Sequence, residues 1–209
     1  MPQSIQLLRG LACLVACAAV GCDSVQSAQD HVSVVGGRAG GPALSGVAGA
    51  GNGTGLEDGE LIAAALTINT AQIEQNSIAV SRAQTTRVMA LAQRLVAMHM
   101  ASQARENSLL ARTTFMPLDN ATSAMLRKAS AETVSRLQQS TGPQFDHDYT
   151  SSQTDAYRME IDLIDQSLLP SSRSAAMSTE LATVRQELVG HWEEVRDMRD
   201  VIEGEGKVL

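Results

Sequence analysis

Aromatic side chains make up only 2% of this 209-residue chain, although 44% of its residues are hydrophobic. The core must therefore be built from aliphatic residues, methionine and alanine. Such side chains suit helices packed side by side, whereas a β-sandwich favours aromatic and β-branched pairs. The composition therefore predicts a helical bundle.

Cysteine is absent beyond residue 22, since the three cysteines are Cys13, Cys17 and Cys22. The rest of the chain can hold neither a disulfide framework nor a thiolate metal site.

Basic residues are outnumbered by acidic ones, which gives a net charge of −7. Because binding to a phosphate backbone needs a basic face, we expect no nucleic-acid partner.

Catalytic and cofactor patterns are missing as well. The glycine-rich stretch has no Gly-Lys-Ser/Thr ending, so it is not a phosphate loop. The motif Glu-x-x-His, which a di-iron bundle carries on two of its helices, occurs nowhere. Val96 lies three residues before His99, and Leu188 lies three residues before His191. These absences disfavour a di-iron oxidase.

Residues 1–21 have the pattern of a lipoprotein signal peptide. Arg9 precedes an apolar run that is too short to span a bilayer. The string AVGC, which ends at Cys22, resembles a bacterial lipobox, in which the cysteine carries lipid. We therefore expect a protein of the bacterial cell envelope, anchored to the inner or the outer membrane through Cys22 and facing the periplasm. The alternative is ordinary signal cleavage, which would leave a soluble periplasmic protein.

Residues 22–56 are rich in glycine, alanine, serine and valine, a composition that cannot bury a core. We interpret them as a disordered tether, which at this length would span roughly 30 Å on a root-mean-square basis. The folded domain is expected over residues 57–203. Gly204 and Gly206 should end its last helix and leave residues 204–209 as a disordered tail.

Within this domain, apolar residues recur at steps of three and four, which is the helical period. The first four helices are predicted at about 58–82, 85–112, 120–139 and 143–168, with Pro170 in the turn that follows. A sustained apolar seam marks the last helix: Met177, Leu181, Val184, Leu188, His191, Val195, Met198 and Ile202. No strand pattern is present. The predicted fold class is all-α, an up-down bundle of four long helices plus a shorter connecting helix.

One face of the second predicted helix begins aliphatic and ends polar. Its members are Val88, Leu91, Leu95, His99, Ser102 and Glu106. A histidine on such a stripe is more often a hydrogen-bonded core residue than a ligand or a pH-sensitive group.

The fourth predicted helix starts with Phe145, Asp146 and Tyr149. We expect Asp146 to cap or charge the N-terminus of this helix. The ring of Tyr149 should lie in the core while its hydroxyl finds a hydrogen-bond partner.

Several runs resemble the motifs of one family. QIEQNSIAVSRA (72–83) and VMALAQRLVAMH (88–99) resemble a pair of helices that read E-I-x-x-G-x-L-A-x-x-x-A and V-x-x-F-A-x-R-M-V-x-D/E-H. FDHDY (145–149) is similar to F-D-x-x-Y, LLP (168–170) to L-L-P, and VGHW around His191 to A-A-H-L. In this order they resemble the DUF4142 family, described as predicted outer-membrane proteins with a ferritin-like helical bundle.

The resemblance covers about residues 57–203 and implies a polar layer in the bundle. The family's recurrent histidines on the second and last helices fall on His99 and His191. Its first-helix glutamate is Gln72 here, and its fourth-helix histidine is Tyr157. Two histidines are too few for a structural zinc site. We therefore expect these four residues to form a hydrogen-bonded layer without stoichiometric metal.

The leading hypothesis is a membrane-anchored envelope lipoprotein with a non-enzymatic bundle that needs no cofactor. The bundle would bind an unidentified envelope protein, or serve a structural or stress-related role. The competing hypothesis is a metal-binding or redox bundle of ferritin-like descent. There a single transition metal would be held by His99 and His191, with Glu106 or Glu187 nearby.

Overall fold

The computed structural model describes residues 56–206, and the expected signal peptide, Cys22 and nearly all of the tether lie outside them. The helices are α1 (Asp58–Arg82), α2 (Thr86–Arg112), α3 (Ala121–Gln139), α4 (Pro143–Leu163), a π-helical turn (Ile164–Leu168), α5 (Leu169–Ser171) and α6 (Ala175–Gly206). The described residues contain no strand, so the all-α prediction is confirmed. None of their helices is long and apolar enough to cross a membrane.

The helix boundaries follow from local capping. Thr85 accepts a hydrogen bond from the Val88 N–H at the start of α2. Asn120 and Ser123 form a reciprocal capping box at the start of α3. Before α4, Gly142 has a φ of 58°, which a residue with a side chain rarely adopts, so the chain turns sharply there.

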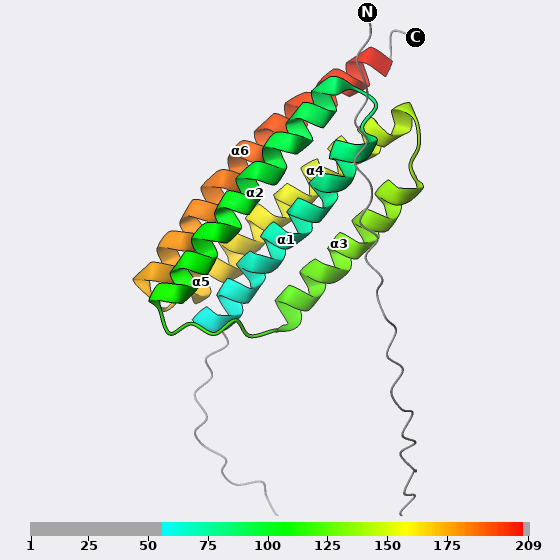
Figure 1. The fold of residues 1–209 in the computed structure, drawn as a ribbon. Coiled ribbons are helices and arrows are strands. Elements are labelled where there is room, and N and C mark those ends of the chain that lie inside the picture. Colours follow the sequence, from blue (N-terminus) through cyan, green and yellow to red (C-terminus); the bar gives the residue numbers. More distant parts are fainter. Residues whose placement is uncertain (1–55, 207–209) are drawn as a thin grey trace, which may run out of the picture. The chain divides into compact units, whose positions relative to one another are not determined.

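Four helices surround the core, and α3 crosses over on the outside of them. The hairpin α1–α2 packs against the hairpin α4–α6, while α3 rests mainly on α1 (Figure 1). The Leu118 N–H donates to the Gly59 carbonyl, which places the start of α3 beside the start of α1. Arg82, at the end of α1, bonds to the end of α3. The helices α1 and α3 therefore run in the same direction, because α2 has already returned the chain to the starting end.

Apolar residues fill the two ends of the bundle, and polar residues interrupt them in the middle of α1. Leu61, Ile62 and Ile68 pack in the larger apolar cluster, and Ala79 belongs to a second cluster. Between them, α1 buries four amide side chains: Asn69, Gln72, Gln75 and Asn76. The apolar members of the α6 seam from Met177 through Val195 are fully buried, so burial of apolar surface stabilises that helix over much of its length.

Two predicted helix ends are wrong. The fourth helix was expected to stop at about Leu168, but it widens into the π-helical turn and continues as α5, with Pro170 inside α5. A proline lacks the N–H and crowds the carbonyl four residues earlier. The wider i→i+5 turn, seen in the Leu169 N–H bond to the Ile164 carbonyl, precedes this position. The last helix also runs past Gly204 to Gly206, because an exposed glycine weakens a helix without having to end it.

Arg82 fastens the far end of α3 to α1. Its guanidinium donates to the carbonyls of Leu137 at 3.0 Å, Gln138 at 2.8 Å and Ser140 at 2.7 Å, and it also lies over the Phe145 ring. These carbonyls lie at the negative end of the α3 dipole and have no partner within the helix.

Replacing Arg82 with alanine should lower the free energy of unfolding by roughly 1–2 kcal/mol, because partly buried helix-end carbonyls lose a charged donor. Arg82→Lys should retain only part of this stabilisation, because an ammonium cannot fork between carbonyls. Arg112→Ala, at an exposed residue that bonds only to Ser108 of its own helix, is the matched control and should change stability little. Urea unfolding of the three variants measures these differences. Equal losses for Arg82→Ala and Arg112→Ala would contradict the role given to Arg82.

Candidate functional site

His99 lies at the centre of the bundle and is hydrogen-bonded on both sides of its ring. Its Nδ1 lies 2.9 Å from Oδ1 of Asn69 on α1, and its Nε2 lies 3.0 Å from the hydroxyl of Tyr157 on α4. The Asn69 amide nitrogen already donates to α2, so its oxygen is the acceptor for His99. Nδ1 therefore carries the proton, and Nε2 accepts from Tyr157.

Asn69 extends this chain to a buried carboxyl group. Its Nδ2 donates to Oε1 of Glu106 at 2.8 Å and to the Ser102 hydroxyl at 3.2 Å. The sequence placed Ser102 and Glu106 on the same face as His99, but it did not indicate Asn69 as their common partner. The signal was present, because Asn69 falls on the buried stripe of the first helix.

Arg105 connects this region to α6. Its guanidinium donates to Glu180 at 2.9 Å, to both oxygens of Glu187 and to the Ser102 hydroxyl. These bonds to the two carboxylates raise the pKa of Arg105 above its ordinary value, although burial acts in the opposite direction. The carboxylate of Glu187, considered above as a metal ligand, is therefore held by Arg105.

Gln72 is buried as expected, but it bonds to another part of the layer. Its amide nitrogen donates to Oε1 of Glu160 at 2.9 Å, and its backbone carbonyl accepts from Asn76. Asn76 in turn accepts from the Tyr149 hydroxyl. Asn69 occupies the position beside His99 that the family mapping gave to Gln72. Glu160 was missed by sequence reasoning, although it follows Tyr157 by three residues on the buried face of α4.

His191 from α6 completes a cluster of three rings. Its ring centroid lies 4.8 Å from that of His99, edge-on, and 5.7 Å from that of Tyr157. Its side chain is only 2% exposed, and neither ring nitrogen has a hydrogen-bond partner among the described residues. The structure therefore brings together three of the four expected layer residues.

Burial makes the titratable groups of this layer neutral at pH 7. It raises the pKa of Glu106 to about 8, although the Asn69 hydrogen bond acts in the opposite direction. It also raises the pKa of Glu160 to about 8, against the bond from Gln72. Burial and the neighbouring His191 lower the pKa of His99 to about 3. Burial likewise lowers the pKa of His191, against the nearby carboxylates of α6.

The donor set does not fit the single metal of the competing hypothesis. Both nitrogens of His99 are engaged, and Glu106 and Glu160 bond to amides at separate places in the layer. No three His, Cys, Asp or Glu side chains of the described residues gather closely enough to hold an ion. His191 alone offers free nitrogens, which is too few ligands for a protein zinc site.

Asp146 lies in the first turn of α4, where its charge was expected, but it is not the capping residue of that helix. The N-terminal cap of α4 is Gly142, whereas the Asp146 carboxylate accepts from the backbone N–H groups of Gln84 and Thr85, both at 2.8 Å. It therefore ties the start of α4 to the joint between α1 and α2. Phe145 and Tyr149 are fully buried beside it with their rings stacked.

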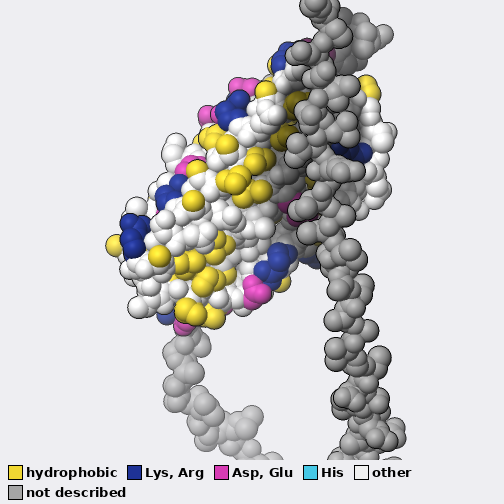
Figure 2. Space-filling model, in the orientation of Figure 1, with side chains coloured by type: hydrophobic (Ala, Val, Ile, Leu, Met, Phe, Trp, Pro, Cys, Tyr) yellow, Lys and Arg dark blue, Asp and Glu magenta, His cyan; other side chains and the backbone are white. Residues whose placement is uncertain are grey.

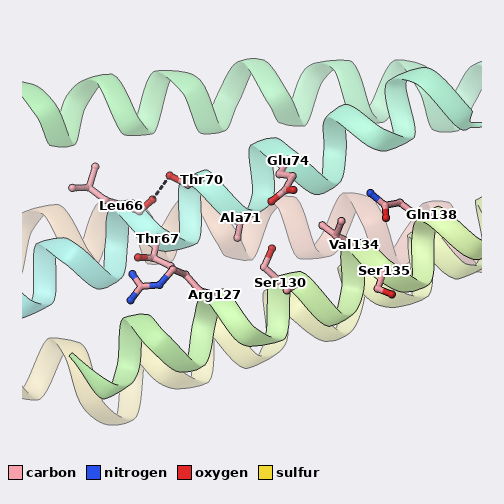
Figure 3. A pocket seen from close by; sticks show the side chains of 11 residues that line it. Leu66, Thr67, Thr70, Ala71, Glu74, Arg127, Ser130, Val134, Ser135 and Gln138 are labelled. Atoms are coloured by element: carbon pink, nitrogen blue, oxygen red, sulfur yellow. Dashed lines mark hydrogen bonds between the residues drawn. The ribbon is translucent and has the colours of Figure 1, made fainter. Parts of the chain in front are cut away.

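A groove lies on the surface between α1 and α3, with a volume of about 580 Å³ (Figure 3). Aliphatic carbon and hydroxyl groups from both helices line it, with Glu74 and Arg127 as its charged residues. The lining residues are Leu66, Thr67, Thr70, Ala71, Glu74, Arg127, Ser130, Ala131, Val134, Ser135 and Gln138. No sequence motif indicated this groove, because it depends on where α3 lies against α1.

Charged side chains of both signs are scattered over the face in Figure 2, with hydrophobic side chains exposed between them. This face therefore has no patch of a single sign that would attract a highly charged ligand from a distance.

Comparison with known proteins identifies one family. The model of the domain of unknown function DUF4142 matches residues 44–198, which is more than half of the chain. No curated protein and no solved structure matches.

Stability should fall as the pH rises from 6.5 to 8. In this range Glu106 and Glu160 stay protonated in the folded protein but are ionised in the unfolded chain, whose carboxyl pKa is near 4.5, so unfolding releases protons. The expected slope is at most about 1.4 kcal/mol per pH unit for each group. His99 acts in the opposite direction: its stabilisation is complete above pH 6.5 and is lost as the pH falls toward 3.

Urea unfolding at pH 6.5 and pH 8 measures this slope. Glu160→Gln should reduce it by about half, because the amide keeps the shape of the side chain and does not ionise. Glu193→Gln, on the exposed face of α6, should leave it unchanged. Stability that rises from pH 6.5 to pH 8 in the unsubstituted protein would show that the two carboxyl groups are ionised in the fold.

Proposed function

The chain belongs to the DUF4142 family, and from that premise we propose that it is a membrane-anchored lipoprotein of a bacterial envelope whose bundle binds a protein partner without catalysing a reaction. The partner-binding surface in this proposal is the groove between α1 and α3. The groove is the observation that carries the proposal.

The closed polar layer argues against catalysis in the core. His99 is 1% exposed, and Glu106 and Tyr157 are fully buried. A catalytic acid or base must lie within hydrogen-bond distance of its substrate. Here His99, Tyr157, Asn69 and Glu106 bond to each other, and a substrate would have to separate the helices to reach them or the buried nitrogens of His191. We therefore assign the layer a structural role in specifying how α1, α2 and α4 pack.

The composition of α3 accounts for the open groove. Only four of its residues are buried, and two of these, Ser123 and Ser130, are small and polar. Because the α3 side chains at the contact with α1 are small, the surface beside this contact stays open as a groove. Ala131 and Val134 then line one wall of the groove, and Leu66 and Ala71 line the other.

The shape and charge of the groove suit an amphipathic helix of the partner. Its lining on α3 runs from Arg127 to Gln138, which corresponds to about 16 Å, or three helical turns. A helix placed there would contact the groove through apolar residues at steps of three and four. Glu74 makes no ion pair within residues 56–206, so it is free to bind a basic residue of that helix.

The anchor in this proposal is Cys22, which lies outside the described residues. Its support is the lipobox-like string AVGC and the absence of cysteine after residue 22. A glycine-rich tether of roughly 30 Å root-mean-square span would let the bundle reach partners near the membrane surface. Inner and outer membranes are equally compatible with this arrangement.

Cells that produce the unsubstituted protein with radiolabelled palmitate should incorporate label into it, and the Cys22→Ala variant should carry none. The unsubstituted protein should fractionate with membranes, because an acylated N-terminus partitions into lipid. Recovery of unlabelled protein in the soluble periplasm would replace the anchor with simple secretion.

A photo-crosslinking amino acid at Ala131, in the groove, should join the chain to one discrete partner in native membranes. The same probe at Ala101, an exposed alanine on α2 outside the groove, is the matched control and should give no such product. Glu74→Arg should reduce the yield from position 131 at least tenfold, because it repels the basic residue proposed for the partner.

Three results would contradict the groove assignment. They are equal products from both positions, a product that is insensitive to Glu74→Arg, and a product with the mass of two copies of this chain. The last would make the groove an interface between copies. A melting temperature measured for each variant separates loss of binding from loss of fold.

A further inference from the structure

Exposed apolar side chains gather at the end of the bundle where α1 begins. Met116 is 72% exposed, Leu118 is 49% exposed, and Met125, in the second turn of α3, is 46% exposed. Met116 and Leu118 belong to the loop 113–120, which joins α2 to α3. Large apolar side chains grouped at one place on a surface mark a contact with another apolar phase or partner.

This loop is held firmly against α1. The Leu118 N–H donates to the Gly59 carbonyl at 3.0 Å, and the Asn120 side chain donates to the Glu60 carbonyl at 3.1 Å. A Cβ on Gly59 would lie only 2.4 Å from the Met116 carbonyl oxygen, so the loop backbone closely approaches the helix at a residue without a side chain. Pro117 fixes a backbone angle between the two exposed residues. The apolar surface is therefore built into the fold.

Two ion pairs lie at this end, and Asp58 and Glu60 in the first turn of α1 add acidic charge without an ion pair among residues 56–206. Asp119 pairs with Arg127 at 2.9 Å, and Glu57 lies 3.9 Å from Arg173. A contact made here would depend on apolar area, with little contribution from long-range attraction.

We propose that this end of the bundle rests on the lipid surface, with Met116, Leu118 and Met125 in the headgroup and upper acyl region. The proposal rests on the proposed function, because it requires a chain held at a membrane. The described structure begins at Leu56, two residues before α1, so the segment that leads back to Cys22 leaves the bundle at this same end. An anchor there brings the loop toward the bilayer. The α1–α3 groove runs along the side of the bundle, from Arg127 to Gln138 on α3, and so extends away from this end.

Three apolar side chains alone bind lipid weakly, as a single short acyl chain does. A tether changes this, because it makes the second contact intramolecular at an effective concentration in the millimolar range. The bundle then spends most of its time seated on the surface. Without the anchor, the same loop should not hold the protein on vesicles.

The test uses the mature chain with a histidine tag in place of Cys22, bound to vesicles of phosphatidylethanolamine, phosphatidylglycerol and a nickel-chelating lipid. This anchor makes the result independent of natural lipidation, which the palmitate experiment tests separately. A single cysteine at Met116 carries the fluorophore NBD, and a second variant carries it at Met125. Met100→Cys is the matched control, because Met100 is 56% exposed but lies in the middle of α2.

On vesicles, NBD at positions 116 and 125 should gain several-fold in intensity, be quenched by lipids brominated in the acyl chain and be shielded from iodide. NBD at position 100 should remain accessible to iodide. The shielding should persist in 1 M salt, because the contact is apolar. Adding Leu118→Ser to Met116→Cys should weaken the shielding, while a normal melting temperature shows that the fold is intact.

Free access of iodide to position 116 on anchored protein would overturn the proposal, and so would shielding that disappears in salt. Shielding at position 116 before vesicles are added would also overturn it. That result would show that another part of the chain or a second copy covers the loop.

Discussion

The structure depends on the requirement that polar groups buried among the helices satisfy one another. Asn69 meets this requirement at the centre, because its oxygen accepts from His99 while its nitrogen donates to Glu106 and Ser102. Unpaired, any of these groups would cost about 1–3 kcal/mol. Shifting α1 along α2 by one turn would break all these bonds together. The polar layer therefore fixes the register of the bundle, which its aliphatic clusters would specify less tightly.

Neutrality is a second consequence of the same burial. Two carboxyl groups and two imidazoles lie in the polar layer, and burial disfavours the charged form of each. The layer thus holds residue types that elsewhere bind metals or transfer protons. Both nitrogens of His99 and one oxygen of each carboxyl group bond within the protein, whereas the other oxygen of each carboxyl group and both nitrogens of His191 have no partner among residues 56–206. The surfaces open to a partner lie on the outside of the bundle, where α3 leaves a groove on one side of α1 and the loop before α3 exposes apolar residues.

The helices could be predicted from the sequence because the residues that start and sustain a helix are close together in the chain. Caps such as Thr85 and Asn120, and apolar steps of three and four, place each helix to within a few residues. The two helix ends that were predicted wrongly depend on the context of the residue and not on its type alone. Pro170 was accommodated by a widened turn, and Gly204 continued a helix that has stabilising contacts elsewhere along its length. Asp146 shows the same limit for a side chain, since its carboxylate serves the joint between α1 and α2, 61 and 62 residues earlier in the sequence.

The sequence alone determined the fold class, the helix periods and the burial of His99 and His191, because these follow from composition and from spacing along single helices. The burial of Tyr157 was implied by the family resemblance. Only the tertiary structure determined which buried side chains form hydrogen bonds with each other. Whether Gln72 meets His99 or Glu160, and whether Asn69 links two helices, depends on the rotation and register of one helix against another. The position of α3 over α1, and with it the groove, is likewise set by contacts between residues far apart in the chain. The spacing of residues along one helix cannot predict such contacts.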